Sequence, residues 1–372
     1  MARIIVQAPD PVILKLEHAL SYWLEVQAKV FVDQEVLFFQ LVRRLLKLKS
    51  EGDLGADSDP VGHAINHPIG HVTEALLRWW YRQVPRDTQG LANEVKQLFT
   101  ELCNTQVEMY RHGRVLLAAH AIALFRVDEE WSRSNLLPLF DWHKSELEAR
   151  AAWEGFLWSP RLYWPLLSAI KQPILETATH YTKLGRHADQ FSAFLTFAAL
   201  DPGETFTKDE LALATKSLPI EGLGEAAQTL VRALEGAGEQ RVEYWRNRVL
   251  LYLKWIWPKS QEISSPAVSE SLARLCVAAR EVFPEAFDQL QHWLKPVNHP
   301  DYLVDQFHEM KICEKYPAEA LAFLNIIIGN DAQWLPHELQ LCLDQIKLTN
   351  PSLSGKPSFI RLIDLIRRRG IS

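Results

Sequence analysis

Three short segments of the sequence place arginine beside aromatic side chains, and this combination can bind a ligand. A guanidinium group packs well over the face of an aromatic ring, and a Trp–Arg surface can stack on a nucleic-acid base or cover a partner's peptide chain. The candidate binding residues are Arg78, Trp79, Trp80 and Arg82 in the first segment, Arg161 and Trp164 in the second, and Arg241, Trp245, Arg246 and Arg248 in the third.

Two other interpretations of these segments compete with nucleic-acid binding. The aromatic rings can pack between helices while the arginines extend to water along their apolar stems. Trp and Arg are also enriched at the energetic centres of protein interfaces. We favour packing for most of these residues, with protein contact next and nucleic-acid contact as the alternative.

The neighbours of each tryptophan separate two groups among the 13 in the chain. Four stand close to prolines near expected helix ends, where we expect them mainly to lock helix junctions; these are Trp158, Trp164, Trp255 and Trp257. Three stand among arginines and are the better candidates for display at the surface; these are Trp79, Trp80 and Trp245.

Histidines recur every four residues at His63, His67 and His71. On one continuous helix they would share a face and could hold a metal ion. Pro68 interrupts such a helix, and no Cys, Asp or Glu stands at a convincing spacing for a fourth ligand. We therefore predict no metal site and interpret the segment as a helix start, with Asn66 or His67 as the N-cap and Pro68 in the first turn.

The sequence lacks the familiar catalytic and nucleotide-binding motifs. It has no P-loop, no GxSxG, no HExxH and no EF-hand loop. The triplet Gly236–Gly238 follows a helical stretch and not a strand, which indicates a helix end. We predict that the chain is not an enzyme and uses no cofactor. An unrecognised enzyme would need a polar pocket with perturbed acids or histidines near His67, His71 and Glu74.

The composition limits the class of protein. Of 372 residues, 48% are hydrophobic and 23% are charged, which is near the average for soluble globular proteins. The net charge of −6 argues mildly against a dedicated nucleic-acid binder, because such proteins usually have a basic excess. No apolar run reaches the roughly 18 residues of a membrane span. The four cysteines are scattered and the N-terminus lacks a signal-peptide pattern, so we predict a cytoplasmic chain.

Apolar residues recur at intervals of three and four along almost the whole chain, which predicts an all-α protein. No run of alternating strand residues stands out. Helices are expected over residues 12–24, 34–48, 69–83, 91–110, 114–125, 135–158, 162–180, 189–199, 209–217, 224–235 and 239–257. A polar loop is expected over 49–62, and the TKDE sequence that begins at Thr207 has the pattern of a capping box.

Prolines recur almost regularly in the last third of the chain. Pro284, Pro317 and Pro351 are 33 and 34 residues apart, and the first two follow an aromatic residue. A helix that ends near such a pair and a second helix that begins after it form a helix–turn–helix repeat. We therefore predict a helical-repeat array of antiparallel helix pairs, similar to HEAT repeats and other α-solenoids. The predicted division is an N-terminal helical region at 1–258, a linker at 259–266 and C-terminal helical repeats at 267–372.

Three short segments carry a resemblance to a known group of proteins. They are Asn66–Leu77 (NHPIGHVTEALL), Trp158–Leu167 (WSPRLYWPLL) and Tyr252–Trp257 (YLKWIW), the last followed by Pro258. The chain resembles the α-helical C-terminal region of large bacterial sirtuin-like anti-phage defence proteins. In that group an N-terminal sirtuin-like domain would hydrolyse NAD, and the helical region would sense or scaffold. This chain lacks the sirtuin motifs, so no catalytic residue carries over, and we hypothesise that it is a fragment of a longer protein.

These observations lead to one main hypothesis and one alternative. The chain is predicted to be a non-enzymatic helical sensor or scaffold module of a bacterial defence protein that binds a protein partner. That partner would be a phage component or another domain of the same polypeptide. The alternative is a nucleic-acid-binding helical domain that uses the Arg and Trp clusters. No membrane contact is expected.

Overall fold

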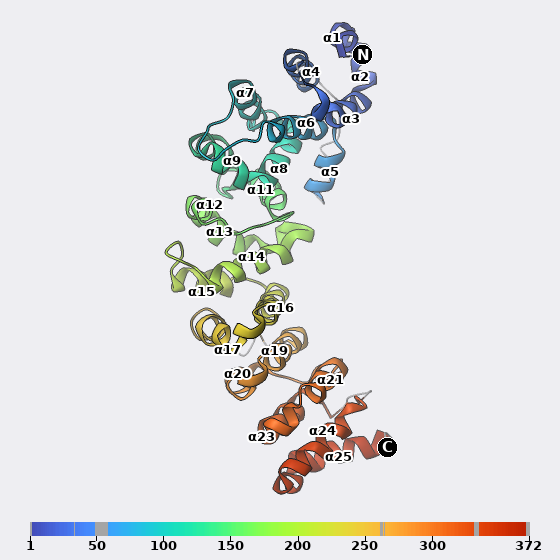
Figure 1. The fold of residues 1–372 in the computed structure, drawn as a ribbon, viewed down its shortest axis with the longest axis vertical. Helices are drawn as coiled ribbons and strands as arrows, with labels where there is room; N and C mark the ends of the chain where they lie inside the picture. The colour runs from blue at the N-terminus through green and yellow to red at the C-terminus, as the bar shows by residue number, and fades with distance from the viewer. Residues whose placement is uncertain are drawn as a thin grey trace. The chain divides into compact units, whose positions relative to one another are not determined.

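The computed structural model describes residues 2–32, 34–48, 59–260, 263, 265–330 and 335–369. In this part of the chain every regular element is a helix, and no strand is found. The prediction of an all-α protein is confirmed. Two compact units divide the chain, Met1–Phe191 and Ser192–Ser372, and Figure 1 draws their helices in chain order.

The first unit consists of short helices. They are α1 (Ala2–Gln7), α2 (Asp10–Lys15), α3 (Glu17–Gln27), η1 (Ala28–Val30), α4 (Glu35–Lys47), α5 (Pro60–Asn66), α6 (Pro68–Arg82), α7 (Asn93–Leu102), η2 (Glu108–Tyr110), α8 (Arg111–Ala119), α9 (Ala121–Val127), α10 (Glu129–Trp131), η3 (Ser132–Leu136), η4 (Leu137–Phe140), α11 (Glu146–Leu157), α12 (Trp164–Ala169), α13 (Lys171–Thr177) and η5 (Ala178–His187). The boundary between the units falls within α14 (Ala188–Leu200).

The second unit also consists mainly of short helices. Its helices are α15 (Lys208–Lys216), α16 (Ile220–Gly236), η6 (Gly238–Gln240), α17 (Arg241–Tyr244), η7 (Trp245–Val249), α18 (Leu250–Trp255), α19 (Pro266–Ala278), η9 (Arg280–Val282), α20 (Phe283–Leu290), η10 (Gln291–Trp293), α21 (Asp301–Glu309), α22 (Ile312–Lys315), α23 (Pro317–Ile327), α24 (Glu338–Thr349), η11 (Pro351–Gly355) and α25 (Pro357–Arg369).

Several helix starts follow from local chemistry, as the sequence predicts. The Thr207 hydroxyl accepts from the Glu210 N–H at 3.2 Å, and the Glu210 carboxylate accepts from the Thr207 N–H at 2.8 Å, which completes the capping box. His67 is the N-cap of α6, and its Nδ1 accepts from the Ile69 N–H at 3.1 Å. Pro68 follows at the first helical position, where its missing N–H costs nothing.

Some of the predicted long helices are wrong, because the chain breaks them. The helix expected over 91–110 ends at Leu102, and a turn precedes η2. The helix expected over 135–158 is replaced by η3 and η4, a polar turn and α11. Most of the loop expected over 49–62 lies outside the described residues, and its end belongs to α5. Both breaks fall on polar stretches, 103–107 and 141–145, which the predicted helices ran through.

The two units offer a division of the chain that differs from the predicted one. The predicted linker, 259–266, lies inside the second unit. α16, earlier in the chain, packs closely against α19, which begins at Pro266, so the helices before and after this segment belong to one packed body. The predicted division around 259–266 stays a prediction beside this one.

Within the first unit, helices pack mainly on others close in sequence. α3 packs on α6, α6 packs on α8, and α8 packs on α11. The contact between α8 and α11 is close, because Gly155 lies where a β-carbon would meet the Val115 carbonyl oxygen at 2.2 Å. A larger residue at position 155 would push the two helices apart.

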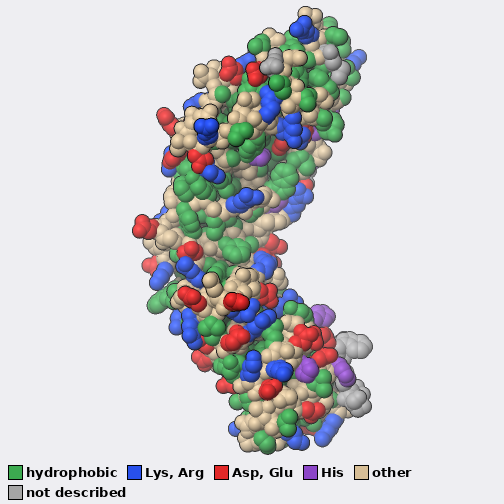
Figure 2. Space-filling view, in the orientation of Figure 1, with side chains coloured by type: hydrophobic (Ala, Val, Ile, Leu, Met, Phe, Trp, Pro, Cys, Tyr) green, Lys and Arg blue, Asp and Glu red, His purple; other side chains and the backbone are tan. Residues whose placement is uncertain are grey.

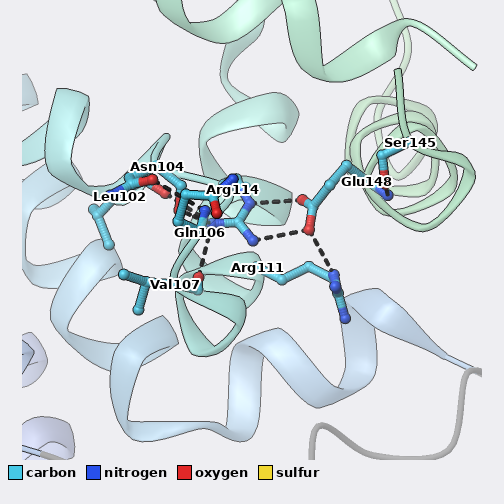
Figure 3. A network of polar contacts seen from close by, with 8 residues as sticks. All are labelled: Leu102, Asn104, Gln106, Val107, Arg111, Arg114, Ser145 and Glu148. Carbon is cyan, nitrogen blue, oxygen red and sulfur yellow. Dashed lines mark hydrogen bonds and ion pairs between the residues drawn. The ribbon is translucent and has the colours of Figure 1, made fainter. Parts of the chain in front are cut away.

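A buried arginine joins these helices to the turn after α7 (Figure 3). Arg114 is 1% exposed, and its Nε and Nη2 donate to the two carboxylate oxygens of Glu148 on α11 at 2.6 and 2.9 Å. Its Nη1 donates to the backbone carbonyls of Leu102, Asn104 and Val107 at 3.2, 2.9 and 3.2 Å. Arg111 also donates to Glu148 at 2.9 Å. The turn after α7 is therefore held by the same group that holds α8 to α11.

In the second unit the helices form two series of contacts. α16 packs on α19, α19 on α21, and α21 on α24. In the other series α20 packs on α23, and α23 on α25. Pro284 lies in the first turn of α20 and Pro317 in the first turn of α23, so both prolines begin a helix of the second series.

Among the described residues, no helix combines the length and the apolar character that a membrane crossing requires.

We predict that Arg114→Met destabilises the first unit strongly. Removing one partner of a buried ion pair leaves Glu148 charged and partly unpaired, which costs about 3–5 kcal/mol. Urea-induced unfolding followed by circular dichroism measures the change. The matched control is Arg133→Met, since Arg133 and Glu129 form an exposed pair on the helix surface that contributes less than about 1 kcal/mol. Equal losses in the two variants would contradict the anchoring role of Arg114.

Candidate functional site

The two tryptophans of the first predicted segment lie in the core. Trp79 and Trp80 are 7% and 3% exposed. Trp79 stacks on Phe38 with ring centroids 6.1 Å apart and meets Phe39 edge-on at 4.8 Å, which fixes α6 against α4. The prediction that these rings are displayed is wrong, and the packing interpretation is confirmed for them. A ligand cannot stack on a ring whose faces are already covered.

The arginines of this segment are engaged in intramolecular contacts. Arg78 pairs with Glu74 at 3.8 Å, as the i,i+4 spacing predicts, and also donates to Glu25 on α3. The second oxygen of Glu25 lies 2.5 Å from Nδ1 of His71. Arg82 lies over the Trp79 ring and donates to the backbone carbonyls of Ala28 and Lys29, both in η1. These contacts join α3 to α6 and leave little of either guanidinium for a ligand.

The second predicted segment begins α12. Arg161 is exposed and makes no ion pair with any described residue. Trp164 is half-buried at the first position of α12. Neither residue lies on the same helix as the first segment, so the sequence similarity of the two segments does not mark one continuous surface.

The third predicted segment is divided between core and surface. Trp245 is fully buried. It opens a π-helical turn, η7, and this turn carries Arg246 and Arg248 outward to Glu285 at 3.5 Å and Asp201 at 2.9 Å. Burial, followed by the charge of Arg280, lowers the pKa of Arg241. The predicted display of Trp245 is wrong, whereas its arginines do reach the surface.

The tryptophans beside prolines also differ from the expectation. Trp257 is buried at 1% exposure after the end of α18, as a junction residue should be. Trp158 and Trp255 are 48% and 57% exposed, so they are the more displayed rings. Lys208 lies over the Trp255 ring at 5.3 Å. Neighbouring prolines and arginines therefore did not indicate which tryptophans are buried.

Histidines from two helices meet where α5 turns into α6. His67 stacks on His112 of α8, with ring centroids 4.0 Å apart and 16° between the planes. Both rings line an open depression of about 390 Å³ together with His63. Burial, followed by the charge of His71, lowers the pKa of His67 to about 4. Burial, followed by the charge of His67, lowers the pKa of His112 to about 3.

This cluster is polar, as an unrecognised enzyme site would have to be. Both stacked imidazoles are neutral at pH 7, and the Nε2 of His112 is buried without a partner among the described residues. No group of three or more His, Cys, Asp or Glu in the described part of the chain is arranged to hold a metal ion. The predicted absence of a metal and of enzyme activity stays a prediction.

A groove in the second unit, which the sequence did not reveal, has the composition of an interface. It has a volume of about 240 Å³ and lies over α16, α19 and α21. Its apolar residues are buried or half-buried, and its rim is polar. The apolar residues are Val231, Val277, Ala278, Leu303 and Met310, and the polar ones are Gln228, Arg232, Glu235, Arg274, Tyr302 and Gln306.

The rim of the groove is organised by Arg274. Its guanidinium lies over the Tyr302 ring at 5.3 Å and donates to Glu270, one turn earlier on α19, at 2.7 Å. Its Nε is buried and has no partner among the described residues. Tyr302 is 52% exposed and the Arg274 side chain is 38% exposed, so the ring and part of the guanidinium are accessible at the groove.

We predict that His112 makes the stability of the first unit depend on pH. Its pKa is lowered in the folded state, so protonation near the ordinary pKa of 6.5 favours the unfolded chain. The stabilising contribution is complete above pH 6.5 and declines as the pH falls toward 3. The free energy difference between the parent and His112→Gln should therefore shrink between pH 7 and pH 5, by on the order of 1 kcal/mol.

Unfolding in urea at the two pH values measures this difference. His292→Gln is the matched control, because His292 is exposed and pairs with no carboxylate among the described residues. A difference for His112→Gln that stays constant between pH 7 and pH 5 would refute the coupling of this histidine to folding.

Comparisons with family models, with curated proteins and with solved structures find no match to this chain. The resemblance to the helical region of sirtuin-like defence proteins therefore stays a prediction.

Proposed function

We propose that this chain is a non-enzymatic helical sensor or scaffold module of a bacterial defence protein, and that it binds a protein partner in the groove over α16, α19 and α21. The observation that carries the proposal is the composition of that groove, with apolar residues at its base and Arg, Gln and Tyr at its rim. Protein interfaces have an apolar centre and a polar rim and are enriched in Tyr, Met and Arg.

The rim supplies specific contacts that a partner can complete. A buried donor without a partner costs free energy, and the Nε of Arg274 is such a donor. A carbonyl or carboxylate of the partner would bind the exposed part of this guanidinium, whose side chain is 38% exposed. An apolar side chain of the partner would displace water from the half-buried Met310, and Tyr302 would cover it. We therefore expect the partner to present an apolar side chain next to an acceptor group.

The two series of helix contacts in the second unit support the proposed helical-repeat arrangement. α19 packs with α20 and α24 with α25, and the two pairs are linked by α21, which contacts α19 and α24, and by α23, which contacts α20 and α25. Proteins of this kind present one series of helices as a binding surface. The groove crosses three helices of a single series, which is where a repeat protein would bind its partner.

Nucleic-acid binding has weaker support. Arg78, Arg246 and Arg248 pair with carboxylates of the chain itself. On the face drawn in Figure 2, basic and acidic side chains are interspersed without a stripe of one sign. Binding to a phosphate backbone depends on a concentration of unpaired cations. A single-stranded oligonucleotide of 20 nucleotides and arbitrary sequence should therefore give no gel shift with this chain at low salt.

The origin of the partner follows from the proposed context. The resemblance favours a phage component or another domain of the same polypeptide, and a cytoplasmic location is consistent with either. A sirtuin-like domain would carry any NAD hydrolysis. The groove can serve both partners, because it needs only an apolar side chain and an acceptor.

We predict that a photo-crosslinking amino acid at position 302 captures a discrete partner in phage-infected or uninfected cells. The side chain at this position is half-exposed at the groove, so it should react with whatever fills it. In a second chain that also carries Arg274→Ala, the product should fall about tenfold or more, because truncating an Arg that an interface depends on commonly costs about 2 kcal/mol. Mass spectrometry of the product identifies the partner.

The matched control places the same crosslinker at position 255, since Trp255 is equally exposed in the same unit but outside the groove. A product at 302 that is absent at 255 and sensitive to Arg274→Ala supports the proposal. Identical products at both positions, or a product at 302 that Arg274→Ala leaves unchanged, would exclude the groove as the binding surface.

A further inference from the structure

A polar depression in the first unit has the features of a small-molecule site. Its volume is about 330 Å³, at the small end of the range for ligand pockets. It lies where α7 ends, beside η3 and the start of α11. Hydroxyl, amide and carboxylate groups line most of it, and Pro138 and Leu139 add an apolar patch. This depression is separate from the groove in the second unit.

One wall of the depression is a π-helical turn. Ser134 and Asn135 belong to η3 and both line the depression. π turns are rare and frequently occur at functional sites. The Asn135 amide donates to the Trp131 carbonyl at 2.9 Å, which leaves its Oδ1 as an acceptor without a partner among the described residues.

Other lining residues are fixed by hydrogen bonds and ion pairs of Arg111 and Arg114. Asn104 lies on the turn after α7, and the three backbone carbonyls that Arg114 binds hold this turn in place. Glu148, which lines the depression and is 5% exposed, is itself fixed by Arg111 and Arg114. A site whose groups are fixed before binding spends less free energy on ordering them.

The free polar groups are both donors and acceptors. The Asp141 carboxylate accepts from the His143 N–H through Oδ1, so its Oδ2 remains an acceptor. The Asn104 Oδ1 accepts from the Gln106 N–H, so its NH2 group remains a donor. The Thr105 hydroxyl makes no hydrogen bond within the described structure, and it can both donate and accept.

We propose that this depression binds a small, neutral, polyhydroxylated molecule the size of a monosaccharide. Each hydroxyl of such a ligand both donates and accepts, which matches a wall of carboxylate, amide and hydroxyl groups. A carboxylate such as Asp141 accepts strongly from hydroxyl donors. The C–H face of the ring would lie on Pro138 and Leu139. A phosphate is a poor match, because Asp141 and Glu148 line the same small space as the single lysine, Lys144.

Titration calorimetry of the full chain with a panel of neutral polyols tests the proposal. The panel comprises D-glucose, D-galactose, D-ribose and myo-inositol, and the comparison compounds are cyclohexanol and glucose 6-phosphate. We expect saturable binding of at least one neutral polyol, weaker binding of glucose 6-phosphate and none of cyclohexanol. Absence of saturation for every neutral polyol at millimolar concentrations, or binding of the phosphate ester alone, would overturn the proposal.

Substitutions of residues that line the depression test whether the ligand binds there. Asp141→Asn should weaken the polyol that binds by about tenfold, the effect of losing one charged hydrogen bond. Asn135→Ala should weaken it by a smaller factor. Asp209→Asn, an exposed carboxylate at the start of α15, is the matched control and should leave binding unchanged. Parallel thermal melts show that each variant is folded. Equal affinity of Asp141→Asn and the parent chain would place the ligand elsewhere and refute this site.

Discussion

The packing of the first unit depends on one buried charge, the guanidinium of Arg114, which needs hydrogen-bond partners. Taking a guanidinium group out of water is costly, and the cost is recovered only if every donor finds an acceptor in good geometry. Arg114 meets this condition with both oxygens of Glu148 and three carbonyls of a neighbouring turn. That requirement explains why α7 stops at Leu102, because carbonyls engaged in a continued helix could not turn toward the arginine. The same side chain ties α8 to α11 through Glu148, while Gly155 allows these two helices to approach closely.

Structural features that depend on residues close in sequence could be predicted from the sequence. Features that depend on residues from other helices could not. The caps at His67 and Thr207 were predictable, because each bonds an amide two or three residues away. The break after α7 was not, since its cause is an arginine a helix further on. The arginine neighbours of Trp79 and Trp245 make them the better candidates for display among the tryptophans, yet both rings are buried. The groove over α16, α19 and α21 has no local pattern at all, because its residues are drawn from three helices spread over about eighty positions.

The arginines and tryptophans serve the fold first. The buried rings fill space between helices, while Arg78 joins α6 to α3 through Glu25 and Arg82 joins α6 to η1 through backbone carbonyls. What remains for recognition is a smaller set of groups that the fold does not use: the Nε of Arg274 and the edge of Tyr302 in the second unit, and the free oxygens and amide of Asp141, Asn135 and Asn104 in the first. Unused hydrogen-bonding capacity is therefore a better guide to function in this protein than residue type.

The π-helical turns η3 and η7 also have a consequence for how the sequence can change over generations. Each turn accommodates one residue more than an α-helix of the same length would, so a deletion of a single codon would restore regular hydrogen bonding. Such a deletion is a small genetic step toward better backbone geometry. If related sequences keep the extra residue at Ser132–Leu136 while neighbouring segments change, selection acts on the π turn itself. If some of them lose it, the function of the π turn was lost with it.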